Sequence, residues 1–193
     1  MAKLSGVRNT VANHLTLPVV LLLTRTSITP STITWFGFLL AVGAAALIVT
    51  RHLFAAGFLV LLAGFFDILD GALARHTNQT TRFGAVLDST LDRLAEAVLL
   101  LGILALYAGE LLLALLVCFA LLGSLLVSYI RARAEALGLE CQTGLFTRAE
   151  RVIVLALGLW LNQVVIALAI IVVFSFITAS QRLVYVWQQT KIK

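Results

Sequence analysis

The stretch DILDGALARHTNQTTRFGAVLDSTLD, from Asp67 to Asp92, places four aspartates in an otherwise strongly apolar chain. The 193-residue sequence is 61% hydrophobic and contains 9 acidic residues in all. Ordinary soluble domains have about 25% charged residues, whereas this chain has 12%. Apolar runs of spanning length recur through most of the sequence. These features predict an all-α, polytopic membrane protein rather than a soluble domain.

Six transmembrane helices fit the apolar runs. A single domain over residues 1–193 is expected, with the six-helix bundle at 28–193 and a juxtamembrane segment at 1–27. In that segment, apolar residues from Leu4 to Leu15 recur at helical spacing, which predicts an amphipathic helix lying in the membrane interface. Pro30 and Ser31 mark the start of the first spanning helix. The six expected spans are approximately 31–50, 53–76, 83–107, 110–134, 147–161 and 163–187.

The basic residues predict how these helices are oriented. Of the 14 lysines and arginines, all but Arg51 and Arg93 fall in the two termini or in loops on the same side. The positive-inside rule makes this side cytoplasmic. We therefore expect a multi-pass protein of the cell membrane with both termini in the cytoplasm. Topology accounts for most of the net charge of +5, and nucleic acid is not an expected partner.

The four aspartates are expected to meet near the cytoplasmic side. Asp67 and Asp70 are three residues apart, and Asp88 and Asp92 are four apart, so each pair shares one helix face. The two helices are predicted to be antiparallel neighbours joined by a short polar loop. Counting residues from that loop places the two pairs at matched depths, so the pairs should face one another.

Such a cluster requires compensating cations. Each charge at membrane depth costs ~2.5–3.5 kcal/mol on insertion scales, and like charges repel. Oxygen-only ligands favour a hard divalent ion, Mg²⁺ or alternatively Mn²⁺. Two ions bridged by shared carboxylates is an arrangement used for phosphoryl displacement. The alternative is a set of salt-bridged helix ends, with Arg75, Arg82 and Arg93 as partners.

The residues between the acids suit a phosphate ligand. Gly71 and Ala74 are small and leave space beside the helix, and Arg75 can hold phosphate oxygens. Gly84 is expected to let the following helix approach a neighbour closely.

The full spacing, D-x2-D-G-x2-A-R-x8-G-x3-D-x3-D, resembles the signature of the CDP-alcohol phosphatidyltransferases, and every position matches. The resemblance implies that a CDP-linked lipid, CDP-diacylglycerol or CDP-archaeol, donates its phosphatidyl or archaetidyl group to an alcohol while CMP leaves. It also implies a homodimer in a lipid membrane. The matching positions are Asp67, Asp70, Gly71, Ala74, Arg75, Gly84, Asp88 and Asp92.

The resemblance also implies a role for each residue. Asp67 and Asp88 would ligate both metal ions, Asp70 one ion and Asp92 the other, and Asp92 would also be the general base. The residues implied to contact the CDP-lipid are Pro30, Ser31, Thr32, Ile33, Gly71, Ala74, Arg75 and Thr81.

A second resemblance concerns the acceptor. SYIRARAEALGL (128–139) and GLFTRAERVIVLALG (144–158) are similar to the branch that makes phosphatidylinositol phosphate or its archaeal ether-lipid counterpart. That branch implies a basic pocket for the phosphate of inositol 1-phosphate. Glycerol 3-phosphate is the next candidate acceptor, since it also needs arginines, whereas serine does not. The matching residues are Arg131, Arg133, Arg148, Arg151 and Arg182.

Simpler interpretations of these charges remain open. Arg131 could pair with Glu135 on the same helix, and Arg148 with Arg151 could bind anionic lipid. Glu96 could pair with Arg93. A cation transporter would also place carboxylates in a membrane. However, transporters often have repeated halves with broken helices near the midplane, and no matching second half is found here.

Overall fold

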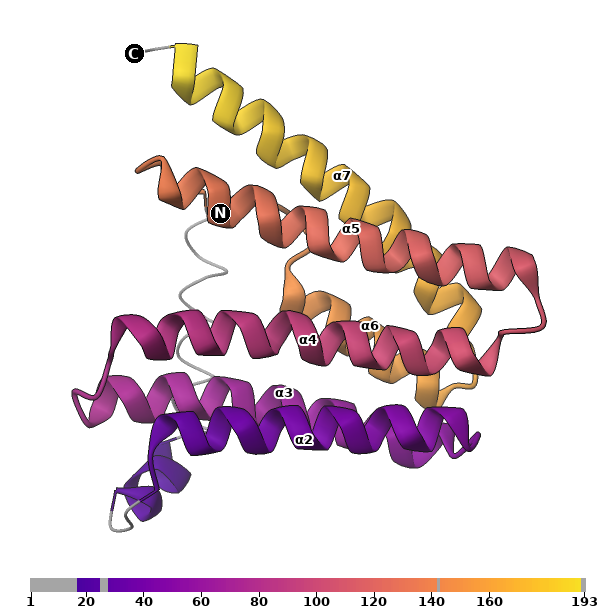
Figure 1. Ribbon diagram of the computed structural model, residues 1–193, viewed down its shortest axis with the longest axis horizontal. Helices are drawn as coiled ribbons and strands as arrows, with labels where there is room; N and C mark the ends of the chain where they lie inside the picture. The colour runs from indigo at the N-terminus through magenta and orange to yellow at the C-terminus, as the bar shows by residue number, and fades with distance from the viewer. Residues whose placement is uncertain (1–16, 25–27, 142, 192–193) are drawn as a thin grey trace.

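The computed structural model describes residues 17–24, 28–141 and 143–191. Within these residues the fold is entirely helical, which confirms the predicted all-α class (Figure 1). A short helical segment at 17–23 precedes the main helices. The expected amphipathic helix before it lies largely outside the described residues. The main helices are α2 (Pro30–Val49), α3 (Leu53–His76), α4 (Arg82–Leu106), α5 (Leu111–Ala136), α6 (Arg148–Trp160) and α7 (Val164–Lys191).

The helices begin close to the predicted positions. Thr29 is the N-cap of α2, its side chain accepts a hydrogen bond from the Thr32 amide, and Pro30 opens the helix. Proline suits this position because its missing N–H has no intrahelical partner there. Thr81 caps α4 in the same manner by accepting from the Gly84 amide at 2.9 Å.

Four described helices, α2, α3, α5 and α7, are long and apolar enough to cross a membrane. Their outer faces expose large apolar side chains such as Leu39, Phe54 and Leu112, as expected of surfaces in contact with lipid. The fifth predicted span is the shortest of the six main helices: α6 has 13 residues and rises only about 20 Å at ~1.5 Å per residue.

Two groups of helices make up the bundle. The helices α2, α3 and α4 lie side by side, and α5 packs along α7 (Figure 1). The short helix α6 contacts both α3 and α7 and therefore connects the two groups. The largest buried apolar cluster includes residues from α2 to α7, so all six helices share one core. This arrangement places the first turn of α6 beside the helices that carry the aspartates.

Gly102 allows α4 to approach α2 closely. A Cβ at this position would lie 3.0 Å from the Ala45 carbonyl oxygen and 3.2 Å from its Cα. We expect Gly102→Val to destabilise the protein by about 1–3 kcal/mol, the usual cost of overpacking a core. Thermal unfolding in detergent measures the effect. Gly109→Val is the matched control, because nothing lies within 4 Å of a Cβ there. Equal unfolding temperatures for the two variants would contradict the assignment.

Candidate active site

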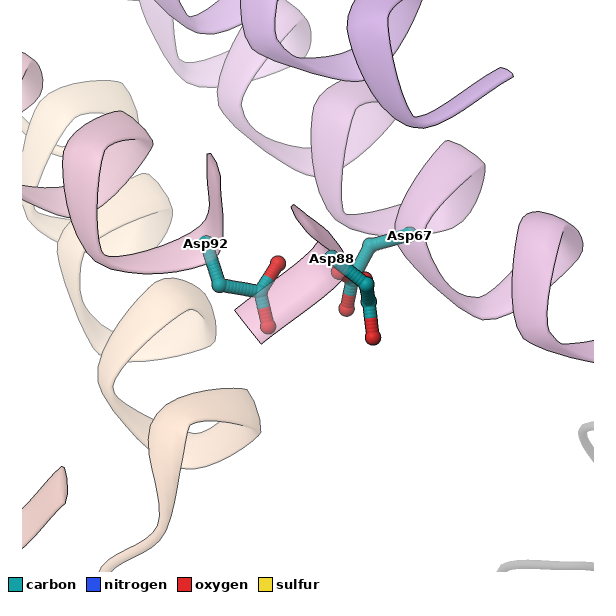
Figure 2. A group of neighbouring side chains, drawn as sticks. All are labelled: Asp67, Asp88 and Asp92. Carbon is teal, nitrogen blue, oxygen red and sulfur yellow. The ribbon is translucent and has the colours of Figure 1, made fainter. Parts of the chain in front are cut away.

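Three of the four motif aspartates form one compact group. Asp67 comes from α3, and Asp88 and Asp92 come from α4, as Figure 2 shows. One carboxylate oxygen from each lies within 4.8 Å of those from the other two. The helices α3 and α4 do not pack closely on one another as predicted, because each packs against α2 instead. The aspartates still meet, so the spacing predicted from sequence does produce a cluster.

Asp70 lies beside this group rather than within it. It lines a small pocket together with Asp67 and Asp92, and it is 4% exposed. Its Oδ2 atom, like Oδ1 of Asp88, is buried and has no hydrogen-bond partner among the described residues. Buried carboxylate oxygens without partners are costly. The all-oxygen donor set and these two oxygens fit hard divalent cations.

Arg148 is the cation that the described structure places on the aspartates. Its Nη1 lies 2.6 Å from Oδ2 of Asp67 and 2.8 Å from Oδ1 of Asp92. Arg148 is the first residue of α6, and the side chain is 25% exposed. The arginines considered as partners, Arg75, Arg82 and Arg93, form none of the described ion pairs to the cluster. Sequence spacing gave no signal for this contact, because it depends on the packing of α6.

Glu96 pairs with Arg151, so the suggested Glu96–Arg93 pair is wrong. Nε of Arg151 donates to Oε1 of Glu96 at 2.6 Å, and Nη2 donates to Oε2 at 2.8 Å. Arg93 instead donates to the Ser89 carbonyl of its own helix. Arg151 is 2% exposed, and its Nη1 has no partner among the described residues. A bidentate pair of this kind fixes both side chains in place.

The remaining arginines of the expected acceptor pocket have different surroundings. Arg131 pairs with Glu135 at 2.8 Å on the exposed side of α5, as the simpler interpretation predicted. Arg133 is exposed near the end of the same helix. Arg182 is buried and donates to the carbonyls of Thr143 at 2.9 Å and Val127 at 2.5 Å. It therefore ties α7 to α5 and to the loop before α6.

The residues expected at the CDP-lipid lie near the start of α2 and the end of α3, and Thr81 caps α4. Arg75 is exposed, and its guanidinium folds back over Gly71, where a Cβ would lie 3.3 Å from Nη1. Ile33 is buried in a small cluster with Leu69 and Leu73 of α3. The others in this set, Pro30, Ser31, Thr32 and Ala74, are exposed or half-buried.

Gly84 takes part in the N-terminal cap of α4 and does not lie at a contact between helices. A Cβ there would lie 2.9 Å from the Thr81 hydroxyl, which is the one described atom within 4 Å. The expectation that Gly84 admits a neighbouring helix is therefore wrong. The capping role of Thr81 was also missed, although a threonine just before a helical pattern is an N-cap signal.

A family model described as CDP-alcohol phosphatidyltransferase matches residues 27–184. The chain belongs to this family. It is 41% identical over 165 residues to archaetidylinositol phosphate synthase of Methanothermobacter thermautotrophicus, covering 82% of this chain and 83% of the relative. It is 39% identical over 182 residues to phosphatidylinositol phosphate synthase of Mycobacteroides abscessus, covering 88% and 82%.

Solved structures of another family member are similar. The crystal structure of Mycobacterium tuberculosis phosphatidylinositol phosphate synthase with CDP-DAG bound has a TM-score of 0.81 and 35% identity, covering 90% of this chain and 94% of that one. The complex of the same enzyme with manganese and citrate has a TM-score of 0.82 at 35% identity, covering 89% and 88%.

Proposed function

We propose that this membrane enzyme transfers the phosphatidyl or archaetidyl group of a CDP-linked lipid to 1D-myo-inositol 1-phosphate and releases CMP. The observation that carries the proposal is the group formed by Asp67, Asp88 and Asp92 at the spacing of the family signature. The inositol phosphate synthases among the relatives support this acceptor. Glycerol 3-phosphate is the alternative acceptor, since it too presents a phosphate to arginines.

The aspartates would hold two divalent ions, Mg²⁺ or Mn²⁺. Asp67 and Asp88 would be shared between the ions, with Asp70 and Asp92 each ligating one. Bound there, the ions would acidify the acceptor hydroxyl and neutralise charge on the two phosphates. The donor set of this chain fits that role, and a manganese complex of the Mycobacterium tuberculosis enzyme exists. A cation transporter does not account for Gly71 and Arg75 beside the acids.

The chain's own residues would carry the remaining steps. Asp92 accepts the proton of the acceptor hydroxyl. The acceptor oxygen then bonds to the lipid-linked phosphorus, and the bond from that phosphorus to the bridging oxygen breaks, so that CMP leaves with the bridge. Arg75 binds phosphate oxygens across Gly71. Pro30, Ser31, Thr32, Ile33, Ala74 and Thr81 line the nucleotide-lipid side.

A single membrane domain with six spans is the proposed topology. The four long apolar helices supply four spans. The helix α4 has 25 residues, about 37 Å at ~1.5 Å per residue, and α6 completes the bundle although it is short. Both termini and the site would face the cytoplasm, where the basic residues concentrate. A homodimer is also proposed.

Parallel assays of the purified protein test the function. CMP release from CDP-diacylglycerol and from CDP-archaeol would be measured with inositol 1-phosphate, glycerol 3-phosphate and serine. We expect turnover with inositol 1-phosphate to exceed that with the other two acceptors. Faster turnover with glycerol 3-phosphate would identify it as the acceptor in place of inositol 1-phosphate. Absence of CMP release from both donors would reject the transferase assignment.

The acceptor pocket is proposed to include Arg131, Arg133, Arg148, Arg151 and Arg182. We expect Arg133→Gln to raise KM for inositol 1-phosphate by about 10-fold or more, since a hydrogen bond to a charged group contributes ~1.5–3 kcal/mol. KM for the CDP-lipid should be unchanged. Arg51→Gln, at the end of α2 on the opposite side, is the matched control. Unchanged acceptor kinetics in Arg133→Gln would leave this arginine with a role in topology alone.

A further inference from the structure

Two ion pairs connect α4 to α6 as successive rungs. The first joins Asp92 to Arg148 at 2.8 Å, and the second joins Glu96 to Arg151 with two hydrogen bonds. Glu96 lies one turn beyond Asp92 on α4, and Arg151 lies one turn beyond Arg148 on α6. The lower rung, Asp92–Arg148, includes a member of the aspartate cluster. The upper rung, Glu96–Arg151, is almost completely removed from solvent.

The upper rung is the more firmly held of the two. Arg151 is 2% exposed, whereas the Arg148 side chain is 25% exposed and makes single-atom contacts with two aspartates. Arg148, Glu96 and Arg151 all line the same small cavity between α3, α4 and α6. Arg148 is thus the less firmly held of the two arginines, while Arg151 is fixed by a bidentate partner.

The first turn of α6 transmits that restraint. Thr147 and Glu150 form a capping box, in which the Thr147 amide donates to Oε2 of Glu150 at 2.7 Å. The capping box satisfies two backbone N–H groups at the start of the helix, so residues 147–151 form an ordered turn. The position of Arg148 therefore follows from where Arg151 is anchored.

We propose that Glu96 is a positioning residue for the transfer reaction, acting through Arg151 to hold the first turn of α6 and thereby Arg148 beside Asp67 and Asp92. This role rests on the proposed function, because its consequence is to place Arg148 between the aspartates and the acceptor phosphate. Buried ion pairs contribute little net stability compared with apolar residues of similar volume. We therefore assign the Glu96–Arg151 pair a role in geometry more than in stability.

Mn²⁺ binding tests the proposal without any catalytic turnover. In the double variant Glu96→Met/Arg151→Met, Arg148 loses its anchor and competes less with the metal at Asp67 and Asp92. Titration followed by the EPR signal of free Mn²⁺ should then show several-fold tighter binding. Arg148→Met should tighten binding as well. Added to Arg148→Met, the double substitution should have no further effect, because residues acting through one another are not additive.

The outcomes of this cycle are distinct. The proposal would be overturned if the Glu96/Arg151 double substitution changed Mn²⁺ affinity equally in the wild-type and the Arg148→Met backgrounds. The pair would then act independently of Arg148. Unchanged or weaker Mn²⁺ binding in the double variant would also overturn it. Glu110→Gln, a glutamate substitution at the far end of α5, is the control and should bind Mn²⁺ as the wild type does.

Kinetics separate positioning from a purely structural role. A misplacement of about 1 Å can reduce a rate by up to ~10²-fold, so the double-Met variant should show a 10- to 100-fold loss in kcat/KM for the acceptor, with KM for the CDP-lipid unchanged. Glu96→Asp retains the charge and should recover part of the loss. A proportional loss for both substrates, tracking the fraction of folded protein, would show that the pair only stabilises the fold.

Two further measurements distinguish a folding defect, or a failure of the proposed function, from a failure of the positioning role. If the double-Met variant fails to fold, Glu96→Asp still decides the question. The shorter carboxylate of Glu96→Asp should also tighten Mn²⁺ binding relative to the wild type, and an unchanged Mn²⁺ affinity would overturn the proposal. If the wild type releases no CMP, the proposed function fails, whereas the Mn²⁺ cycle still tests whether Glu96 acts through Arg148.

Discussion

Asp92→Asn is expected to reduce kcat by at least ~10²–10⁴-fold, the loss typical of removing a general base. The amide preserves the shape of the side chain and one oxygen, but it cannot accept the proton of the acceptor hydroxyl. Asp92 belongs to the carboxylate group and touches Arg148 at 2.8 Å. Asp92→Asn also removes the negative charge of the Asp92 carboxylate from the proposed metal site, so Mn²⁺ affinity must be measured in the same variant.

Rate and binding measurements together isolate the base. CDP-lipid should bind Asp92→Asn with an affinity close to that of the wild type, while single-turnover CMP release slows. Direct attack by the alcohol also requires both substrates to be bound, so initial-rate kinetics of the wild type should be sequential. A lipid-phosphoryl adduct trapped on Asp92, with CMP released before the acceptor arrives, would instead identify this residue as a nucleophile.

Chelation is the second change with a large expected effect. EDTA should reduce CMP release to background, and added Mg²⁺ or Mn²⁺ should restore it. The physical reason is that the carboxylates of Asp67, Asp88 and Asp92 lie within 4.8 Å of one another, where they would repel an incoming diphosphate. Arg148 alone does not offset three carboxylates.

The control for chelation distinguishes metal loss from unfolding. Thermal unfolding of the EDTA-treated protein should remain cooperative, and activity should return with a dependence on metal concentration. Chelation with Ca²⁺-saturated EDTA should have little effect when Mg²⁺ is in excess. Full activity in a rigorously metal-free preparation would contradict the proposed two-ion site.

The helices and the aspartate cluster could be predicted from local sequence features. Apolar runs, short polar turns and Pro30 gave helix bounds within a few residues of those observed. The spacing of three and four residues on two antiparallel helices predicted the group of Asp67, Asp88 and Asp92, although both helices pack against α2 and not closely on one another. These features depend on helical periodicity and on one short loop, both of which are visible in sequence.

Long-range side-chain partners could not be predicted in the same way. Glu96 and Arg151 are 55 residues apart, and their contact depends on how α6 packs against α3 and α7. The local alternative, Arg93, is on the correct spacing for an exposed helix pair, but such pairs contribute only ~0.2–0.5 kcal/mol. A buried arginine leaves a far larger cost if it lacks a partner, so Arg151 takes the carboxylate.

Arg148 also bears on the cost of keeping acidic side chains in a membrane. Its guanidinium lies between Asp67 and Asp92 in the completed fold, and a counter-charge in that position lowers the cost of their charges in the bilayer. The chain itself therefore supplies part of the neutralisation that its acidic site requires. On the proposed function, loading of a divalent ion would replace one cation with another, and the metal would be needed for activity more than for assembly.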